Sequence, residues 1–176
     1  MERILVALDG SDHSNKAVDL AADLAEKYAA QLVLLHVVSN KPLSDAERHM
    51  AEVEYLDDIV SSIEAPSVLG SSGDPRLRGQ QLLTHYSDVV HRFREAVGNR
   101  LTHAARSRAQ AKGVRAVETA LADGDPAQTI VDRADALEAD MIIMGSRGLG
   151  GAKSLLMGSV SHKVAHLAAC TCVTVK

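Results

Sequence analysis

The stretch RILVALDGSDHSNKAVDLAADLAEKYAAQLVLLHVV, residues 3 to 38, decides the fold. Its two ends, Arg3–Leu8 and Gln31–Val38, are short continuous apolar runs, which is typical of strands buried on both faces of a sheet. Between them, DGSDHSN supplies turn chemistry, and apolar residues then recur at helical spacing to about Ala30. A strand, a helix and a second strand in this order predict a parallel sheet with a right-handed crossover.

The C-terminal third continues the alternation of strands and helices. Gly113 suits the left-handed residue that follows a helix, while Asp125 and Gln128 form a capping box around Pro126, a favoured first helical residue. We expect a strand over residues 114–121, a helix from about 126, a short strand over 141–144, a helix over about 160–169 and a strand from Cys172 to Val175. The pattern predicts an α/β fold with a doubly wound, Rossmann-like parallel sheet and helices on both faces.

The middle of the chain departs from this rhythm. Its 176 residues predict a single domain over residues 1–176, but residues 39–113 are longer than one crossover helix requires. We expect a variable insertion over residues 39–80, with a helical segment at about 43–63 and a Gly/Ser/Pro-rich loop at 65–79. A long helix with an apolar stripe that includes Leu101 and Ala104 follows. The loop is either a surface insertion or a lid over a site.

Composition excludes several classes of protein. The net charge of −4 gives no general attraction to nucleic acid or to an anionic membrane, and no apolar run reaches the roughly 18 residues of a membrane span. Aromatic residues make up only 2% of the chain, so a base would be held by aliphatic side chains and backbone groups rather than by aromatic stacking. Residues 1–10 carry no secretory leader pattern, and Cys170 and Cys172 fit reduced structural thiols, so we expect a cytoplasmic protein.

The stretch GSRGLGGAKSLLMGS, residues 145 to 159, is the strongest candidate for a binding loop. It lacks the glycine before Lys153 that a P-loop needs, and it lacks the third glycine of the dinucleotide fingerprint. It nevertheless follows a predicted strand at its carboxyl end, where open α/β sheets bind ligands. Its glycines allow backbone N–H groups to approach an anion, and Gly158 opens a helix whose N-terminus is partially positive. A turn that needs glycine for packing alone is the other interpretation.

The glycine spacing Gly145-x2-Gly148-x9-Gly158-Ser159, with MIIMGSRGLGG before it and ILVALDGSDHSNKAV near the N-terminus, closely resembles the universal stress protein family in its ATP-binding form. The resemblance covers residues 2–38 and 114–175 and leaves out residues 39–80. It implies a five-stranded parallel sheet in the order 3-2-1-4-5. In that order the loops at Asp9 and Gly145 face one crevice at the topological switch point.

The resemblance also implies a role for each site residue. Asp9 would bind the ribose hydroxyls, the backbone of Val37 would pair with the adenine edge, and Leu8 and Met144 would pack on the base. The residues implied to line the phosphates are Gly145, Arg147, Gly148, Gly158, Ser159, Val160 and Ser161. The implied cofactor is ATP or another adenine nucleotide, and Asp9 could hold an accompanying Mg²⁺.

The motifs favour a binding protein over an enzyme. The chain has no G-x-S-x-G elbow, and His162 and His166 lack the glutamate of a zinc-protease motif, so we assign no catalytic residue and no metal site. We expect an ATP-binding regulatory protein of the stress response, acting as a nucleotide-dependent switch or partner binder with slow hydrolysis at most. A slow ATPase or phosphotransfer enzyme is the alternative. A nucleic-acid-binding face on the arginines of the long helix is a third interpretation, against which acidic residues interspersed on that helix argue.

The last strand suggests a mode of assembly. In the implied strand order it lies at the edge of the sheet, where an apolar strand invites pairing. We expect a homodimer joined by antiparallel pairing of Cys172 to Val175 from two chains, in a symmetric contact. A protein partner is also expected, although the sequence does not identify it.

Overall fold

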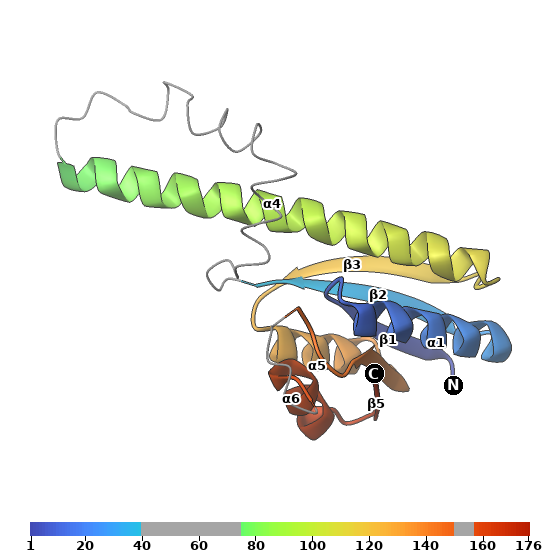
Figure 1. The fold of residues 1–176 in the computed structure, drawn as a ribbon. Helices are drawn as coiled ribbons and strands as arrows, with labels where there is room; N and C mark the ends of the chain where they lie inside the picture. The colour runs from blue at the N-terminus through green and yellow to red at the C-terminus, as the bar shows by residue number, and fades with distance from the viewer. Residues whose placement is uncertain (40–74, 150–156) are drawn as a thin grey trace. The chain divides into compact units, whose positions relative to one another are not determined.

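A computed structural model describes residues 1–39, 75–149 and 157–176 (Figure 1). The chain divides into two compact units, Met1–Asn40 with Val97–Lys176, and Lys41–Ala96. In the second unit the described part is a single helical segment, residues 75–96. The first unit contains the sheet and all of the predicted site residues.

The sheet has five parallel strands in the order β3-β2-β1-β4-β5, which confirms the predicted topology. The strands are β1 (Arg3–Leu8), β2 (Gln31–Val38), β3 (Val117–Asp123), β4 (Met141–Gly145) and β5 (Thr171–Val175). The strand β1 lies between β2 and β4. The strands β2 and β3 therefore extend the sheet from one edge of β1, and β4 and β5 extend it from the other edge. The carboxyl ends of β1 and β4 therefore form the switch point of a doubly wound sheet.

Helices cover both faces of the sheet, as predicted (Figure 1). They are α1 (Asp12–Tyr28), α4 (Pro75–Ala111), α5 (Pro126–Ala136) and α6 (Ser159–Leu167). On one face, α1 and the C-terminal part of α4 cover Ile4, Val6, Leu32, Leu34 and Ile143. On the other face, α5 and α6 cover the strand residues whose side chains point in the opposite direction, among them Leu5 and Ile142. The alternation follows from the strand period of two, which turns successive side chains to opposite faces.

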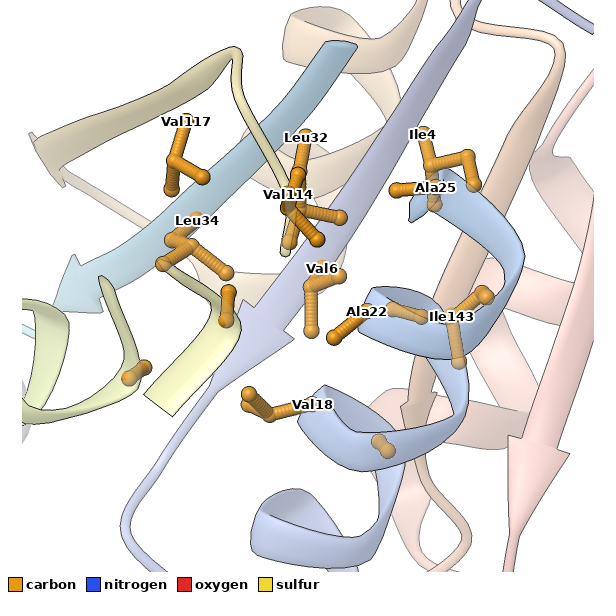
Figure 2. Packing of buried hydrophobic residues seen from close by; sticks show 14 of the residues in the cluster. Ile4, Val6, Val18, Ala22, Ala25, Leu32, Leu34, Val114, Val117 and Ile143 are labelled. Carbon is orange, nitrogen blue, oxygen red and sulfur yellow. The ribbon is translucent and has the colours of Figure 1, made fainter. Parts of the chain in front are cut away.

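The face under α1 is packed through small side chains. Ala17, Ala21, Ala22 and Ala25 of α1 are essentially inaccessible to solvent, and Figure 2 shows Ala22, Ala25 and Val18 among the strand residues. An alanine surface lets the helix lie close to the sheet, so Ile4, Val6 and Leu34 fill the space between them. At the outer side of α1, the guanidinium of Arg108 on α4 donates to both carboxylate oxygens of Asp19 at 2.6 Å.

The third strand begins later than predicted. The apolar residue Val114 is not in the strand but in the cap that ends α4: its N–H donates to the carbonyl of Ala109, and that of Gly113 donates to Gln110. Gly113 has a φ of +97°, so its predicted role as the left-handed residue after the helix is confirmed. In such a cap an apolar residue after the glycine packs back on the helix, which explains why Val114 is buried without being in a strand.

The long helix begins earlier than predicted. Residues 75–79, assigned to a loop by composition, are the first residues of α4, since Pro75 is well suited to a first helical position. The rest of the expected loop and the helical segment at 43–63 lie outside the described residues, and the insertion over residues 39–80 stays a prediction. One residue of the predicted apolar stripe of α4 was wrong: Ala104 is exposed, whereas Ala105 and Ala109 are buried, and Leu101 is partly buried as the stripe predicted.

Candidate functional site

The candidate site lies at the carboxyl ends of β1 and β4, which are adjacent and in register to Ala7 and Met144. Beyond these residues each strand turns into a polar loop. The loop after β1 leads into the first turn of α1, and the loop after β4 begins at Ser146, directly after Gly145. The predicted site residues of these two loops are therefore brought together.

Asp9 is held in place by the start of α1. Its Oδ1 accepts hydrogen bonds from the backbone N–H of Ser11 at 3.0 Å and from Ser11 Oγ at 2.7 Å, and its own N–H donates to Ser14 Oγ at 3.3 Å. Gly10 allows this turn, because it has a φ of +82°. The other oxygen, Oδ2, lies against Gly148, where a side chain would collide with it. Asp9 thus presents one oxygen to Ser11 and one to the glycine loop.

Ser11 joins the two loops directly. Its Oγ lies 3.2 Å from the carbonyl oxygen of Arg147 and 2.7 Å from Asp9 Oδ1, so its hydrogen is shared between two acceptors. The same oxygen accepts the N–H of Ser14 at 3.2 Å as the cap of α1. Ser11 was not among the predicted site residues, although a serine just before a helical pattern signals a cap.

The three glycines that carry the predicted motif differ in what surrounds them. A Cβ on Gly145 would lie 2.8 Å from the backbone nitrogen of Ser14 and 2.9 Å from the Cβ of His13, so this glycine is required by the close approach of α1. Gly148 is required by Asp9. A Cβ on Gly158 would have ordinary contacts, with the nearest atoms at 3.5 Å. Packing within the described residues explains the first two glycines and does not explain the third.

Gly158 is the N-cap of α6. Its φ of −77° and ψ of 162° are open to any residue, and among the described residues no side chain caps the helix. The first-turn amides of Ser159, Val160 and Ser161 have no acceptor within the helix and form a partially positive end. Ser161 is buried, and its hydroxyl donates to the carbonyl of Ser146 at 2.8 Å. The hydroxyl hydrogen of Ser161 is therefore already used, and its backbone N–H is the group available to an anion.

Ser146 connects the surrounding elements. Its side chain is 2% exposed, and its N–H donates to the carbonyl of Val175 on β5 at 2.7 Å. Its carbonyl accepts the N–H of Gly158 at 2.7 Å as well as the Ser161 hydroxyl. Its Oγ lies 3.1 Å from Nδ1 of His13 on α1. Sequence reasoning missed Ser146 and His13, because a long-range hydrogen bond between two polar residues leaves no periodic signal.

Val37 borders the same edge of the sheet. The ladder between β1 and β2 ends at Leu8 and His36, whereas the ladder between β2 and β3 continues to Val38 and Asp123. The backbone of Val37 therefore extends beyond the end of β1. Beside it, Nδ1 of His36 lies 2.9 Å from the carbonyl oxygen of Leu8, which ties the two strand ends together.

Leu8 and Met144 are both buried, and they lie on opposite faces of the sheet. Leu8 belongs to the cluster under α1, and Met144 to the cluster under α5 and α6. Each is the core residue nearest the polar loop that follows its strand.

The described part of the site presents the Asp9 carboxylate and the first-turn amides of α6 at the carboxyl ends of β1 and β4. The described ranges contain no group of three or more side chains suited to hold a metal ion. Ser146 and His13 form a serine–histidine pair, but the serine is inaccessible to a substrate. Burial raises the pKa of the Cys170 and Cys172 thiols, which favours their protonated form at neutral pH. Within the described helices, none is both long and apolar enough to cross a bilayer.

The fold and this edge define a doubly wound α/β protein with a glycine-rich loop at its switch point. All of the chain, residues 1–176, matches the sequence profile of the universal stress protein family. The chain belongs to this family, as its motifs predicted.

Relatives and solved structures agree with this assignment. The chain is 31% identical to the universal stress protein YxiE of Bacillus subtilis, over 99% of this chain and 98% of that protein. Its fold is similar to that of the universal stress protein UspA of Lactobacillus plantarum, with a TM-score of 0.63, 21% identity and coverage of 99% and 97% of the two chains. It is also similar to a universal stress protein solved in complex with cAMP, with a TM-score of 0.58, 22% identity and coverage of 99% and 97%. A family member from Arabidopsis thaliana solved with AMP bound has a TM-score of 0.59, 18% identity and coverage of 100% and 92%.

Proposed function

We propose that this protein binds an adenine nucleotide, ATP in particular, at the carboxyl ends of β1 and β4 and acts as a nucleotide-dependent regulator in the stress response. The observation that carries the proposal is Gly158, a helix-capping glycine that neither its backbone conformation nor its packing against the described residues requires. Close approach of a phosphate to the amides of α6 supplies the missing reason. Family members solved with cAMP and AMP support the choice of an adenine nucleotide.

The proposed binding mode assigns each part of the nucleotide to one loop. The phosphates lie between the α6 amides and the loop of Gly145, Arg147 and Gly148. The ribose hydroxyls bond to Asp9, whose Oδ2 lies against Gly148 and so borders the phosphate loop. The adenine edge pairs with the backbone of Val37, which extends beyond the end of β1. Leu8 and Met144 are buried on opposite faces of the sheet, so the proposal does not place both of them against the base.

Regulation by binding is favoured over catalysis. The one serine–histidine pair among the described residues of the site is buried at its serine, and hydrolysis needs a base that can reach an attacking water. A Mg²⁺ held by Asp9 and the phosphates would neutralise charge without supplying such a base. We therefore expect ATP turnover slower than about one per minute, far below the usual enzymatic range of about 1–10³ per second.

The proposal includes a cytoplasmic location and a homodimer. Two unpaired cysteines, Cys170 and Cys172, are typical of a reducing compartment. The position of β5 at the edge of the sheet supports antiparallel pairing of Cys172 to Val175 between two chains. A nucleotide-dependent protein partner completes the proposed regulatory role.

The experiment is calorimetric titration of the purified protein with ATP, AMP and cAMP, with GTP as the matched control. The proposal predicts micromolar binding of at least one adenine nucleotide and binding of GTP weaker by about tenfold or more, because the backbone of Val37 recognises the adenine edge. Equal affinity for ATP and GTP would remove the adenine assignment. Turnover of several ATP per second in the same preparation would favour the enzyme alternative.

A further inference from the structure

The contact between His13 and Ser146 joins two parts of the site that are 133 residues apart in the sequence. His13 is the second residue of α1, and Ser146 follows the last residue of β4. Nδ1 of the histidine lies 3.1 Å from the serine Oγ, so one of the two groups donates to the other in either ring tautomer. The imidazole is partly accessible, while the serine is buried.

The backbone of Ser146 is hydrogen-bonded to the start of α6, so the position of Ser146 affects the position of that helix end. Its carbonyl accepts from the N–H of Gly158 and from the hydroxyl of Ser161, so two groups at the start of α6 depend on it. Its N–H is fixed by Val175. The position of the α6 amides relative to the Gly145–Gly148 loop is therefore set through Ser146.

The backbone of His13 is itself firmly placed. Gly145 approaches α1 so closely that a Cβ at this position would contact both His13 and Ser14. The first turn of α1 is also capped by Ser11 and bonded to Asp9 through Ser14. A fixed donor or acceptor on this turn can therefore define where the Ser146 hydroxyl points.

We propose that His13 is a positioning residue of the nucleotide site, which acts through Ser146 and does not itself contact the nucleotide. The inference rests on the proposed function and adds a residue to it. The His13 ring holds Ser146 so that the amides of α6 and the glycine loop converge on the phosphates before the nucleotide arrives. Preorganisation of this kind improves affinity because fewer groups are ordered on binding.

Removal of the imidazole has a defined consequence. His13→Ala leaves the buried Ser146 hydroxyl without this partner, and such a group tends to rotate or admit water. The carbonyl of Ser146 then holds Gly158 less firmly. We expect nucleotide affinity to fall about tenfold, which corresponds to the loss of one well-placed hydrogen bond.

The experiment compares His13→Ala, His13→Asn and His13→Gln with a distant control, His166→Ala, which removes an exposed imidazole from the last turn of α6. Asparagine places its amide group where Nδ1 lies, whereas glutamine places it nearer the position of Nε2. Calorimetry with ATP should show near wild-type affinity for the asparagine variant and about tenfold weaker binding for the alanine and glutamine variants. Ser146→Ala combined with His13→Ala should be no weaker than the weaker single variant, since both remove the same contact.

A second measurement does not require nucleotide. Amide hydrogen exchange of the free protein should be faster at Gly158 in His13→Ala and unchanged in His13→Asn and His166→Ala. If wild type bound no nucleotide, the proposed function would fail, and unchanged exchange at Gly158 would separately refute the positioning role. Equal affinity of wild type and His13→Ala, or additive effects of the two alanine substitutions, would also overturn it.

Discussion

At the scale of single residues, the three glycines of the motif differ in what surrounds each of them. Gly145 and Gly148 are glycines because α1 and Asp9 occupy the space of a side chain, whereas the described residues around Gly158 leave room for one. The sequence motif marks all three equally, since spacing shows where glycines are and not what they contact. Packing therefore explains Gly145 and Gly148, while ligand approach is our proposal for Gly158.

Asp140 shows a residue effect that depends on pH. Its Oδ2 accepts from the backbone N–H groups of Arg3 and Glu2, and these bonds hold the pKa of the carboxyl below its ordinary value. A lowered pKa in the folded state means that the carboxylate stabilises the fold at neutral pH and that this contribution is lost as the pH falls through the folded pKa.

We therefore predict that Asp140→Asn lowers the melting temperature at pH 7 and that the two proteins converge in acid, once the pH has fallen below the lowered pKa of the wild-type carboxyl. Thermal unfolding followed by circular dichroism between about pH 2.5 and 7 measures this. Asp132→Asn, on the exposed side of α5, is the control. A constant difference between wild type and Asp140→Asn across that range would contradict the assignment.

At the scale of elements, sequence reasoning placed each strand and helix that the structure describes, with its largest errors at the starts of β3 and α4. β1 and β2 have the predicted bounds because their apolar runs end sharply at polar turns. The start of β3 was wrong because an apolar residue in a helix cap looks like the first residue of a strand. The start of α4 was wrong because Gly79 suggested a loop, whereas one glycine costs a long helix only about 1 kcal/mol.

Gly98 of α4 was not singled out by the sequence, yet it sets how closely the helix approaches the sheet. A Cβ there would lie 2.6 Å from the ring of His36 and 2.9 Å from Leu121. His36 has limited freedom to move, because its Nδ1 is paired with the carbonyl of Leu8.

We predict that Gly98→Ala destabilises the protein by about 1–2 kcal/mol, because overpacking costs about 1–3 kcal/mol and outweighs the gain of under about 1 kcal/mol in helix propensity. Urea denaturation measures the change. The double variant Gly98→Ala with His36→Ala should recover part of the loss, since it removes the ring that the new methyl meets. Stabilisation by Gly98→Ala alone would show that α4 moves away without cost.

At the scale of the whole molecule, the strand order was predictable and the connections within the site were not. The order came from the family resemblance and is confirmed, with Asp9 and the glycine loop on neighbouring strands. The links made by Ser11, His13 and Ser146 depend on side-chain distances of about 3 Å, which no spacing along the chain reveals. Most of the predicted site residues lie on the two loops or at the start of α6, and the others, Leu8, Val37 and Met144, lie near the ends of their strands.

Charged substitutions next to the edge strand β5 test the pairing register of the proposed dimer. If Cys172 to Val175 pairs with itself in antiparallel register, Thr171 lies opposite the partner's Lys176. Thr171 is exposed, so substitutions there leave the core intact. We predict that Thr171→Lys raises the dimer dissociation constant several-fold and that Thr171→Glu lowers it, because each symmetric pair contributes about 0.2–1 kcal/mol of repulsion or attraction. Sedimentation equilibrium at low salt measures both. The same shift for the two charges would refute this register.

The central claim is that Gly158 is a glycine because a nucleotide phosphate approaches it. The most direct measurement is the ATP affinity of Gly158→Val by calorimetry, alongside its urea unfolding free energy, with Gly145→Ala as the matched control. We predict that Gly158→Val loses about a hundredfold or more in affinity and about 1 kcal/mol or less of stability, because valine is a poorer N-cap than glycine but its Cβ meets only ordinary contacts with the described residues. Gly145→Ala should instead lose about 1–3 kcal/mol of stability, because its methyl group meets the backbone of α1. Unchanged ATP affinity in a folded Gly158→Val protein would contradict the central claim.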